Sequence, residues 1–251
     1  MKLRPALLFV ALSAMFAAQA QTADEIIKKY LENTGGEAKW RTVEGMRMKA
    51  NLKMQGMELP MESLQLRDGK TFSSVIFQGM TFNQNVFDGS TLWSTNQMTM
   101  KPEKSDAEST ENYKLTAAAD FPDPFLDYQK KGYKVEFLGK ETVEGTETFK
   151  LKLTKKPIKV DGKDTENVSI YYFDAENYVP LVIESEITSG PAKGMISQTK
   201  MSDYQEVNGL MMPFSITQGA KGQPGGVTIN TTTVELNPKV DPKIFAFPSG
   251  N

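Results

Sequence analysis

The 251-residue sequence contains no cysteine and no histidine. Without cysteine, the protein cannot form a disulfide, use a thiol nucleophile or carry an acyl group on an N-terminal cysteine. Without histidine, it cannot build a Ser-His or Cys-His nucleophile, a histidine-ligated metal site or an imidazole acid-base pair. Carboxylate chemistry remains possible, but we expect a protein with no catalytic residues, no metal, no cofactor and no lipid anchor of its own.

A strong charge of either sign is also missing. The chain has 29 basic and 31 acidic side chains, a formal net charge of −2, and no basic stripe of the kind that binds nucleic acid. With 39% hydrophobic and 24% charged residues, its composition is that of an ordinary soluble globular protein. Because no internal repeat or linker divides the chain, we expect a single domain over residues 21–251.

Residues 1–20 have the three parts of a secretory signal peptide. They comprise a positive start with Lys2 and Arg4, an apolar run over residues 6–17, and an Ala-x-Ala cleavage site that ends at Ala20. The apolar run is too short to span a bilayer. We expect cleavage near Ala20 and a soluble periplasmic protein.

An amphipathic helix is expected directly after this segment. Thr22 and Glu25 form a capping box, apolar residues follow at helical spacing, and a Gly-Gly pair at 35–36 ends the helix. Trp40 follows, and we expect it to fill the core beneath this helix.

Most of the remaining chain has the pattern of β-strands. From Met46 onward, apolar and polar residues alternate strictly, which is typical of a strand with one buried face. Residues 70–100 then have the pattern of three strands joined by Gln-Gly and Asp-Gly hairpin turns at 78–79 and 88–89. Hairpin patterns return over residues 134–236. In total we expect about eleven antiparallel strands.

The strand pattern is missing from residues 101–132. Residues 115–119 favour a helix, and prolines at 122 and 124 lead into a second short helix that ends at Gly132. An insert of this size is usually a lid, a plug or a disordered loop. Its aromatic and leucine content favours a packed helical lid.

A large sheet with one apolar face needs that face covered, and only the two helical regions are available to cover it. The fold that meets this requirement is mainly β (α+β). We expect a half-open antiparallel β-barrel in which a few helices act as a lid over an apolar concave face.

Two motifs are similar to those of a known family. Residues 86–93 (Val-Phe-Asp-Gly-Ser-Thr-Leu-Trp), followed by Asn96, resemble a V-x-DG-x-T-LW…N hairpin of the LolA/LolB-like superfamily of periplasmic carriers that sort outer-membrane lipoproteins. Residues 240–250 resemble the closing D-x-x-x-F-x-F-x-P-x-G element of that superfamily. The order of the parts is similar over nearly the whole mature chain.

This resemblance implies a carrier that binds the acyl chains of lipoproteins, or other lipids, in an apolar cavity and transfers them towards the outer membrane. An inner-membrane donor and an outer-membrane acceptor protein are the implied partners. In such carriers an arginine on an early strand contacts the lid. Arg67 stands at the corresponding place, although Asp68-Gly69 replaces the proline of the family pattern. On the lid itself, Phe125 and Leu126 are the expected contacts.

Methionine is concentrated in the first strands, and its flexible, polarizable side chain suits a surface that accepts variable acyl chains. The alternative is that these methionines fill an ordinary core. The residues expected to line the cavity are Met46, Met48, Leu52, Met54, Leu64, Leu66, Met80, Phe82, Trp93, Met98, Leu181, Ile183, Met212 and Phe214.

Three other functions remain open. The same fold could serve as an envelope scaffold or sensor whose cavity is filled by side chains. A glycosidase would need two carboxylates; Asp88, Asp174 and Asp203 are available, but each lies at an expected turn or strand end, where aspartate is common. An outer-membrane barrel would need aromatic girdles around lipid-facing strands, and the expected helices argue against it.

Overall fold

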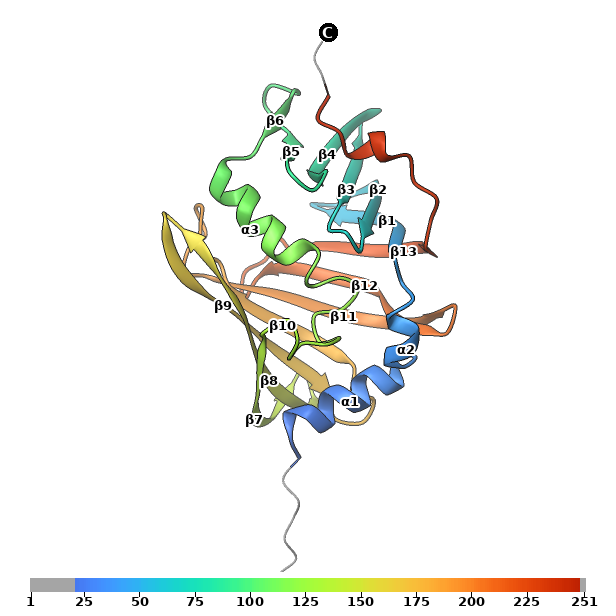
Figure 1. Cartoon of the computed structure of the whole chain (residues 1–251), viewed down its shortest axis with the longest axis vertical. Helices are drawn as coiled ribbons and strands as arrows, with labels where there is room; N and C mark the ends of the chain where they lie inside the picture. The colour runs from blue at the N-terminus through green and yellow to red at the C-terminus, as the bar shows by residue number, and fades with distance from the viewer. Residues whose placement is uncertain (1–20, 249–251) are drawn as a thin grey trace, which may run out of the picture.

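The computed structural model describes residues 21–248, so the predicted signal peptide and its cleavage site lie outside the described residues. Within them, the chain forms one curved sheet with a few helices beside it (Figure 1). The helices are α1 (Ala23–Asn33), α2 (Glu37–Trp40), α3 (Ala107–Ala117) and the 3-10 helix η1 (Pro242–Phe245). The strands are β1 (Gly45–Met54), β2 (Met57–Leu66), β3 (Thr71–Phe77), β4 (Met80–Phe87), β5 (Leu92–Thr95), β6 (Pro102–Lys104), β7 (Lys134–Val143), β8 (Thr146–Val160), β9 (Lys163–Asp174), β10 (Pro180–Glu186), β11 (Ile196–Val207), β12 (Leu210–Ala220) and β13 (Val227–Leu236).

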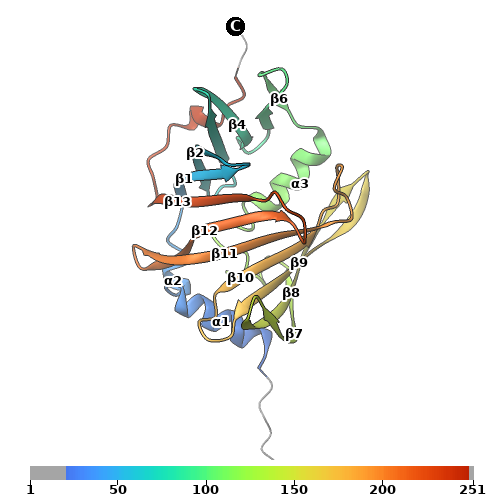
Figure 2. The same cartoon turned by 180° about the vertical axis from the view of Figure 1, so that it is seen from behind.

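The strands lie in the order β6-β5-β4-β3-β2-β1-β13-β12-β11-β10-β9-β8-β7. Neighbouring strands pair in antiparallel fashion, including the first and last strands of the chain, β1 and β13, which meet in the middle of the sheet. Strands β6 and β7 are the two edges, and the sheet curves without closing (Figures 1 and 2). The predicted half-open antiparallel barrel is confirmed. The sheet has thirteen strands rather than about eleven, and β6 lies in the insert that was expected to lack strands.

Helices α1 and α2 cover one half of the concave face. The capping box forms as predicted: Thr22 Oγ1 accepts a hydrogen bond from the Glu25 amide, and the Glu25 carboxylate accepts one from the Thr22 amide. Trp40 is buried at the end of α2 and donates from Nε1 to Thr34 Oγ1 at 3.1 Å. The apolar side of α1 packs on the strands β8, β9 and β12, with which it forms the main hydrophobic core.

Residues 119–133, which we call the cover segment, lie over the same half of the concave face as α1 and α2. Phe121, Phe125 and Leu126 are buried in the same core as α1. The prediction of a short regular helix at the end of this segment is wrong, because residues 124–131 form a series of turns. Asp127 has a φ of +55°, and a left-handed residue interrupts a right-handed helix.

Helix α3 crosses the space between the two edges of the sheet. Its C-terminal end reaches β2, where Gln65 Nε2 donates to the Ala117 carbonyl oxygen, and its N-terminal half, which follows β6, lies at the tip of the β8–β9 hairpin (Figure 1). There, the Glu108 carboxylate accepts hydrogen bonds from the amides of Asp161 and Gly162 at 3.0 and 2.7 Å. The Asn112 side chain exchanges two hydrogen bonds with the Lys159 backbone, at 2.7 and 2.8 Å. Among the helices of residues 21–248, none has the length and apolar character needed to cross a membrane.

A smaller core, the C-terminal cluster, lies on the other face of β2 to β5. The register of β1 and β2 pairs Met48 with Ser63 and Arg47 with Leu64, so Leu64 points away from the face that carries Met48. A bulge in β4 at Asn85 changes the alternation there, and the next residue, Val86, packs in this cluster. The buried members of the cluster are Leu64, Val86, Trp93 and Phe245, and Leu66, Phe72, Val240, Ile244 and Phe247 pack against them.

Candidate functional site

Three cavities lie along the concave face of β1. The deep cavity, of about 240 Å³, adjoins the cover segment; the middle cavity, of about 300 Å³, adjoins α3; and the open cavity, of about 430 Å³, lies at the far end of β1. Met46 and Met48 line both the deep and the middle cavity. Leu52 and Met54, further along the same strand, line the open cavity. The interior is therefore a row of spaces that leads from the covered half of the sheet to the uncovered half.

The open cavity is the largest of these three spaces, and its walls are mainly apolar. Its lining comes from β1 to β4, from β13 and from Gln97, without a residue of α1, α2 or the cover segment. Its volume falls in the range of about 300–1,000 Å³ that is usual for small-molecule sites. The apolar lining residues are Leu52, Met54, Met57, Leu59, Val75, Phe77, Phe82 and Val227.

The middle cavity is more polar. Serine, glutamine and asparagine side chains from β2 to β4 contribute to its lining. Tyr113 of α3 closes one side: its hydroxyl lies 2.7 Å from Thr71 Oγ1, and its ring packs edge-on against Phe87 at 5.4 Å between centroids. The polar groups on this stretch place a hydrogen-bonding surface between two apolar spaces.

The deep cavity has mainly apolar walls but contains one buried carboxyl group. Asp123 Oδ2 accepts a hydrogen bond from the Tyr30 hydroxyl at 2.5 Å, and Asp123 Oδ1 accepts one from the Phe125 amide at 2.8 Å. Burial raises the pKa of Asp123, and these hydrogen bonds only partly offset the effect. Lys131 Nζ donates to the Asp123 carbonyl oxygen at 2.8 Å, and burial lowers the pKa of this lysine. Asp123 therefore links α1, the cover segment and the cavity wall.

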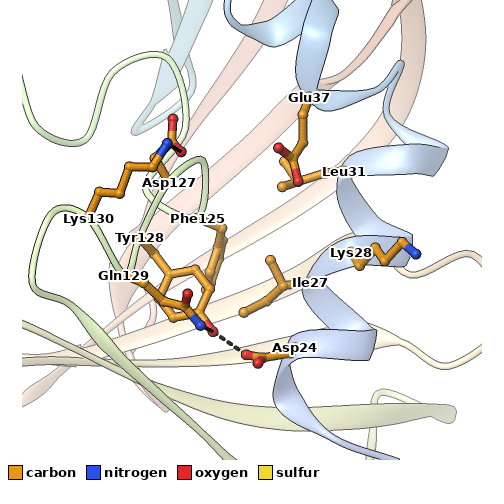
Figure 3. Close-up of a pocket in the computed structure, with 10 residues that line it drawn as sticks. All are labelled: Asp24, Ile27, Lys28, Leu31, Glu37, Phe125, Asp127, Tyr128, Gln129 and Lys130. Atoms are coloured by element: carbon orange, nitrogen blue, oxygen red, sulfur yellow. Dashed lines mark hydrogen bonds and ion pairs between the residues drawn. The ribbon is translucent and has the colours of Figure 1, made fainter.

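A groove of about 330 Å³ lies between α1 and residues 125–130 (Figure 3). Ile27, Leu31 and Phe125 supply its apolar floor. The Tyr128 hydroxyl donates to the Asp24 carboxylate across the groove, as the dashed line in Figure 3 shows. We interpret this groove as the seam along which the cover segment packs on α1.

Ion pairs between charged side chains also stabilise this seam. Asp127 pairs with Arg41, and Arg41 also donates to the Glu37 carboxylate at 2.7 Å. The Arg41 guanidinium and the Lys130 ammonium, which lies 2.9 Å from Asp127 Oδ1, hold the pKa of Asp127 down to about 2. The charges near the seam are thus paired within the protein.

Arg67 contacts the chain that leaves α2 rather than the insert. Its guanidinium donates to the carbonyl oxygens of Arg41 and Val43 at 2.9 and 2.6 Å. It also forms an ion pair with Glu44, with 3.0 Å between Nε and the carboxylate. The hairpin that carries Arg67 does reach the insert, because Gln65 Nε2 donates to the Ala117 carbonyl oxygen at 3.1 Å. Arg67 therefore fixes the entry of the chain into β1.

The structure separates the residues that the sequence suggested as a cavity lining. Met46, Met48, Ile183 and Met212 line the deep cavity, and Leu52, Met54 and Phe82 line the open cavity. Leu66 and Trp93 belong to the C-terminal cluster, as does Leu64, which also borders the middle cavity. Met80 and Met98 are exposed, Leu181 lines a separate surface pocket, and Phe214 is buried outside the linings of these three cavities. Of the expected lid contacts, Phe125 lines the deep cavity and Leu126 is buried in the main core.

Sequence reasoning missed the polar residues of the deep cavity: Tyr30, Asp123, Tyr171 and Tyr204. The signal that could have found Asp123 is its place in Phe-Pro-Asp-Pro-Phe, a carboxylate within an apolar turn. Among residues 21–248, no group of three or more Asp or Glu side chains is arranged to hold a metal ion.

Comparisons with known proteins bear on the fold. No protein-family model matches the sequence, and a search of curated proteins finds no match. Solved structures do match: a LolA superfamily protein from Nitrosomonas europaea has a TM-score of 0.52 at 14% identity, covering 90% of this chain and 98% of that one. A domain described as outer-membrane lipoprotein-sorting, from Vibrio parahaemolyticus, has a TM-score of 0.52 at 12% identity, covering 88% of this chain and 94% of that one. A DUF1329 family protein from Desulfovibrio piger matches with the same TM-score and identity, covering 88% and 97%. The protein has the LolA/LolB-like fold.

Proposed function

We propose that this protein is a soluble periplasmic lipid carrier, not an enzyme. It binds an acyl chain of a lipoprotein, or of another lipid, in the open and middle cavities and transfers it towards the outer membrane. An inner-membrane donor and an outer-membrane acceptor are the partners that such transfer requires. The Ala-x-Ala segment that ends at Ala20 supports export, and the absence of cysteine supports a protein without a lipid anchor of its own.

The open cavity is the observation that carries this proposal. It is an apolar space of about 430 Å³ that the helices and the cover segment leave uncovered. Burying methylenes gains about 0.8 kcal/mol each, so a stretch of about eight methylenes would contribute roughly 6 kcal/mol. A bilayer offers nearly the same gain, so the free-energy difference between the membrane-bound and the protein-bound chain is small and exchange needs no local energy source.

Native mass spectrometry of the protein purified from its own envelope tests this function. We expect an adduct with the mass of an acylated species, which disappears after extraction with organic solvent. A clean apo mass, together with no uptake of a fluorescent fatty acid, contradicts a carrier function.

A pair of variants locates the binding site. Leu52→Glu puts a carboxylate into the open cavity, whereas Leu138→Glu changes an exposed leucine on the edge strand β7. A charge in an apolar cavity opposes burial of an acyl chain. We expect L52E to weaken binding of the fluorescent fatty acid roughly tenfold or more and L138E to leave it unchanged. Equal affinity of the two variants contradicts the proposed site.

A filled-cavity scaffold or sensor is the second candidate. The observation in its favour is the closed half of the concave face, where Phe121, Phe125 and Tyr133 occupy the space that a ligand would need. If the envelope-purified protein carries no lipid but co-purifies with a defined protein partner, this second function replaces the first.

A further inference from the structure

The deep cavity contains a polar atom that its surroundings leave unpaired. Tyr171 lines this cavity and is only 7% exposed, and its hydroxyl forms no hydrogen bond with any residue in the described range 21–248. Its ring is fixed edge-on against Phe125, with centroids 4.8 Å apart, and is stacked on Phe173 at 6.0 Å. The side-chain atoms of residues 21–248 that are fully enclosed without a hydrogen-bond partner are Arg47 Nε and Arg67 Nε, so the Tyr171 oxygen is accessible from the cavity, where a ligand can supply its partner.

The other tyrosines of this cavity already have partners. The Tyr30 hydroxyl donates to Asp123, and the Tyr204 hydroxyl donates to the Pro180 carbonyl oxygen at 2.5 Å. Tyr171 is therefore the tyrosine of this group with free hydrogen-bonding capacity within residues 21–248.

Asp123 supplies an acceptor in the same cavity. Each of its carboxyl oxygens accepts from the protein, Oδ2 from the Tyr30 hydroxyl and Oδ1 from the Phe125 amide. A carboxylate has about four acceptor positions, so unused capacity remains. Burial and the nearby Asp123 carboxyl both raise the pKa of Tyr171, which keeps its hydroxyl protonated and able to donate.

We propose that the deep cavity binds the hydroxyl group of a neutral lipid, which accepts a hydrogen bond from Tyr171 and donates one to Asp123. An alcohol is both donor and acceptor, so it fits this pair. The hydrocarbon chain then passes Met46 and Met48, which line both the deep and the middle cavity, towards the open end. This inference rests on the proposed lipid-binding function and adds the chemical class of the lipid.

Charge selects among related amphiphiles. A fatty-acid carboxylate only accepts hydrogen bonds and would bring a negative charge next to Asp123. A long-chain amine donates, but a charged ammonium must lose its water in an apolar space. We therefore expect the affinity order to be alcohol first, with the amine and the carboxylate weaker.

The test measures displacement of a fluorescent acyl probe by dodecanol, dodecylamine and dodecanoate, with the full mature chain and two variants. Tyr171→Phe removes the unpaired oxygen, and we expect it to weaken dodecanol binding about three- to tenfold while leaving dodecanoate unchanged. Tyr204→Phe is the matched control: its hydroxyl lies in the same cavity but is already bonded, so the preference for dodecanol should persist.

A thermal unfolding measurement of the apo proteins separates a ligand role from a structural one. Because the Tyr171 hydroxyl has no partner within residues 21–248, Y171F should unfold at the same temperature as the wild type or higher. A lower unfolding temperature, with unchanged selectivity, overturns the inference. If all three amphiphiles bind wild type and Y171F alike, the inference fails and the carrier function stands. If none binds the wild type, both fail.

Discussion

The two halves of the concave face have similar strands but different coverings. Along β8, β9 and β12, the apolar side chains pack under α1 and the cover segment and form the main core. Along β1 to β4, the equivalent side chains line the open cavity. The strand pattern alone therefore makes an apolar surface, and segments distant in sequence decide whether that surface becomes a core or a cavity.

The difference also separates stability from function. In the closed half, aromatic rings interlock: Phe125 packs edge-on against Tyr30, Tyr171 and Phe173. In the open half, Phe82 and Leu52 are only half-buried. A substitution in the closed half should affect folding, whereas one in the open half should affect ligand binding.

The largest expected effect comes from Phe125→Ala. This ring is 2% exposed, so its removal leaves a cavity and should lower the free energy of unfolding by about 3–5 kcal/mol. Phe82→Ala is the matched change in the open half and should cost less than about 1.5 kcal/mol, because Phe82 remains partly in contact with water. Urea denaturation measures both. Equal losses would remove the distinction between the two halves.

Arg67→Ala tests how the closed half is joined to β1. It removes the hydrogen bonds to the carbonyl oxygens of residues 41 and 43, and we expect a loss of about 2 kcal/mol in the free energy of unfolding. The control is Arg47→Ala on β1, whose partners are the partly exposed carboxylates of Glu62 and Glu235. Such surface ion pairs contribute at most about 1 kcal/mol. A larger loss for R47A would contradict this assignment.

Asn112→Ala should release α3 from the β8–β9 hairpin. The Lys159 amide donates to Asn112 Oδ1 at 2.8 Å, so in the variant this amide should exchange with solvent deuterium faster. The stability loss should be about 1 kcal/mol. Hydrogen exchange at Leu151, in the middle of β8, should stay unchanged because it lies in the main core. Unaltered exchange at Lys159 would mean that α3 does not hold the hairpin.

The smallest effect is a pH dependence at the seam. Arg41 and Lys130 lower the folded-state pKa of Asp127 to about 2, so its stabilising contribution is present above the ordinary carboxyl pKa and is lost as pH falls from about 4 to about 2. The free energy of unfolding of Asp127→Asn should not show this loss at low pH. Asparagine tolerates the left-handed backbone at this position. Denaturation curves at several pH values below 4 measure the difference.

Asp123 acts with the opposite sign. Burial raises its folded-state pKa, so its contribution favours the folded state at low pH and is lost as pH rises through that pKa. The two aspartates therefore act in separate pH ranges.

If the loss of stability at low pH is identical in wild type and D127N, the role assigned to Asp127 is contradicted.

Much of the fold was predictable because alternation and hairpin turns are local signals. The strand that begins near Met46, the turn at Gln78-Gly79 and the cap at Thr22 all form as the sequence indicates. Which face a residue occupies was less predictable. Leu64 points to one face of β2, and Met57 and Met61 point to the other. A C-terminal segment about 180 residues later in the chain covers Leu64.

The site was predictable only in part. The apolar positions of β1 follow from alternation, whereas the polar groups of the deep cavity depend on where the cover segment folds back. Asp123 meets Tyr30 across 93 residues of sequence, and no local pattern encodes that contact. Asp127, in the turns that replaced the expected helix, likewise pairs with a residue distant in sequence, Arg41.

Methionine-methyl NMR tests the contrast between the two halves most directly. Met54 and Met57 line the open cavity, whereas Met98 is 93% exposed and lies outside the lining. On titration with a long-chain acyl ligand, we predict saturable shifts of the Met54 and Met57 methyl signals and none at Met98. Titration without shifts at Met54 and Met57, or with equal shifts at Met98, would contradict a ligand site in the open half.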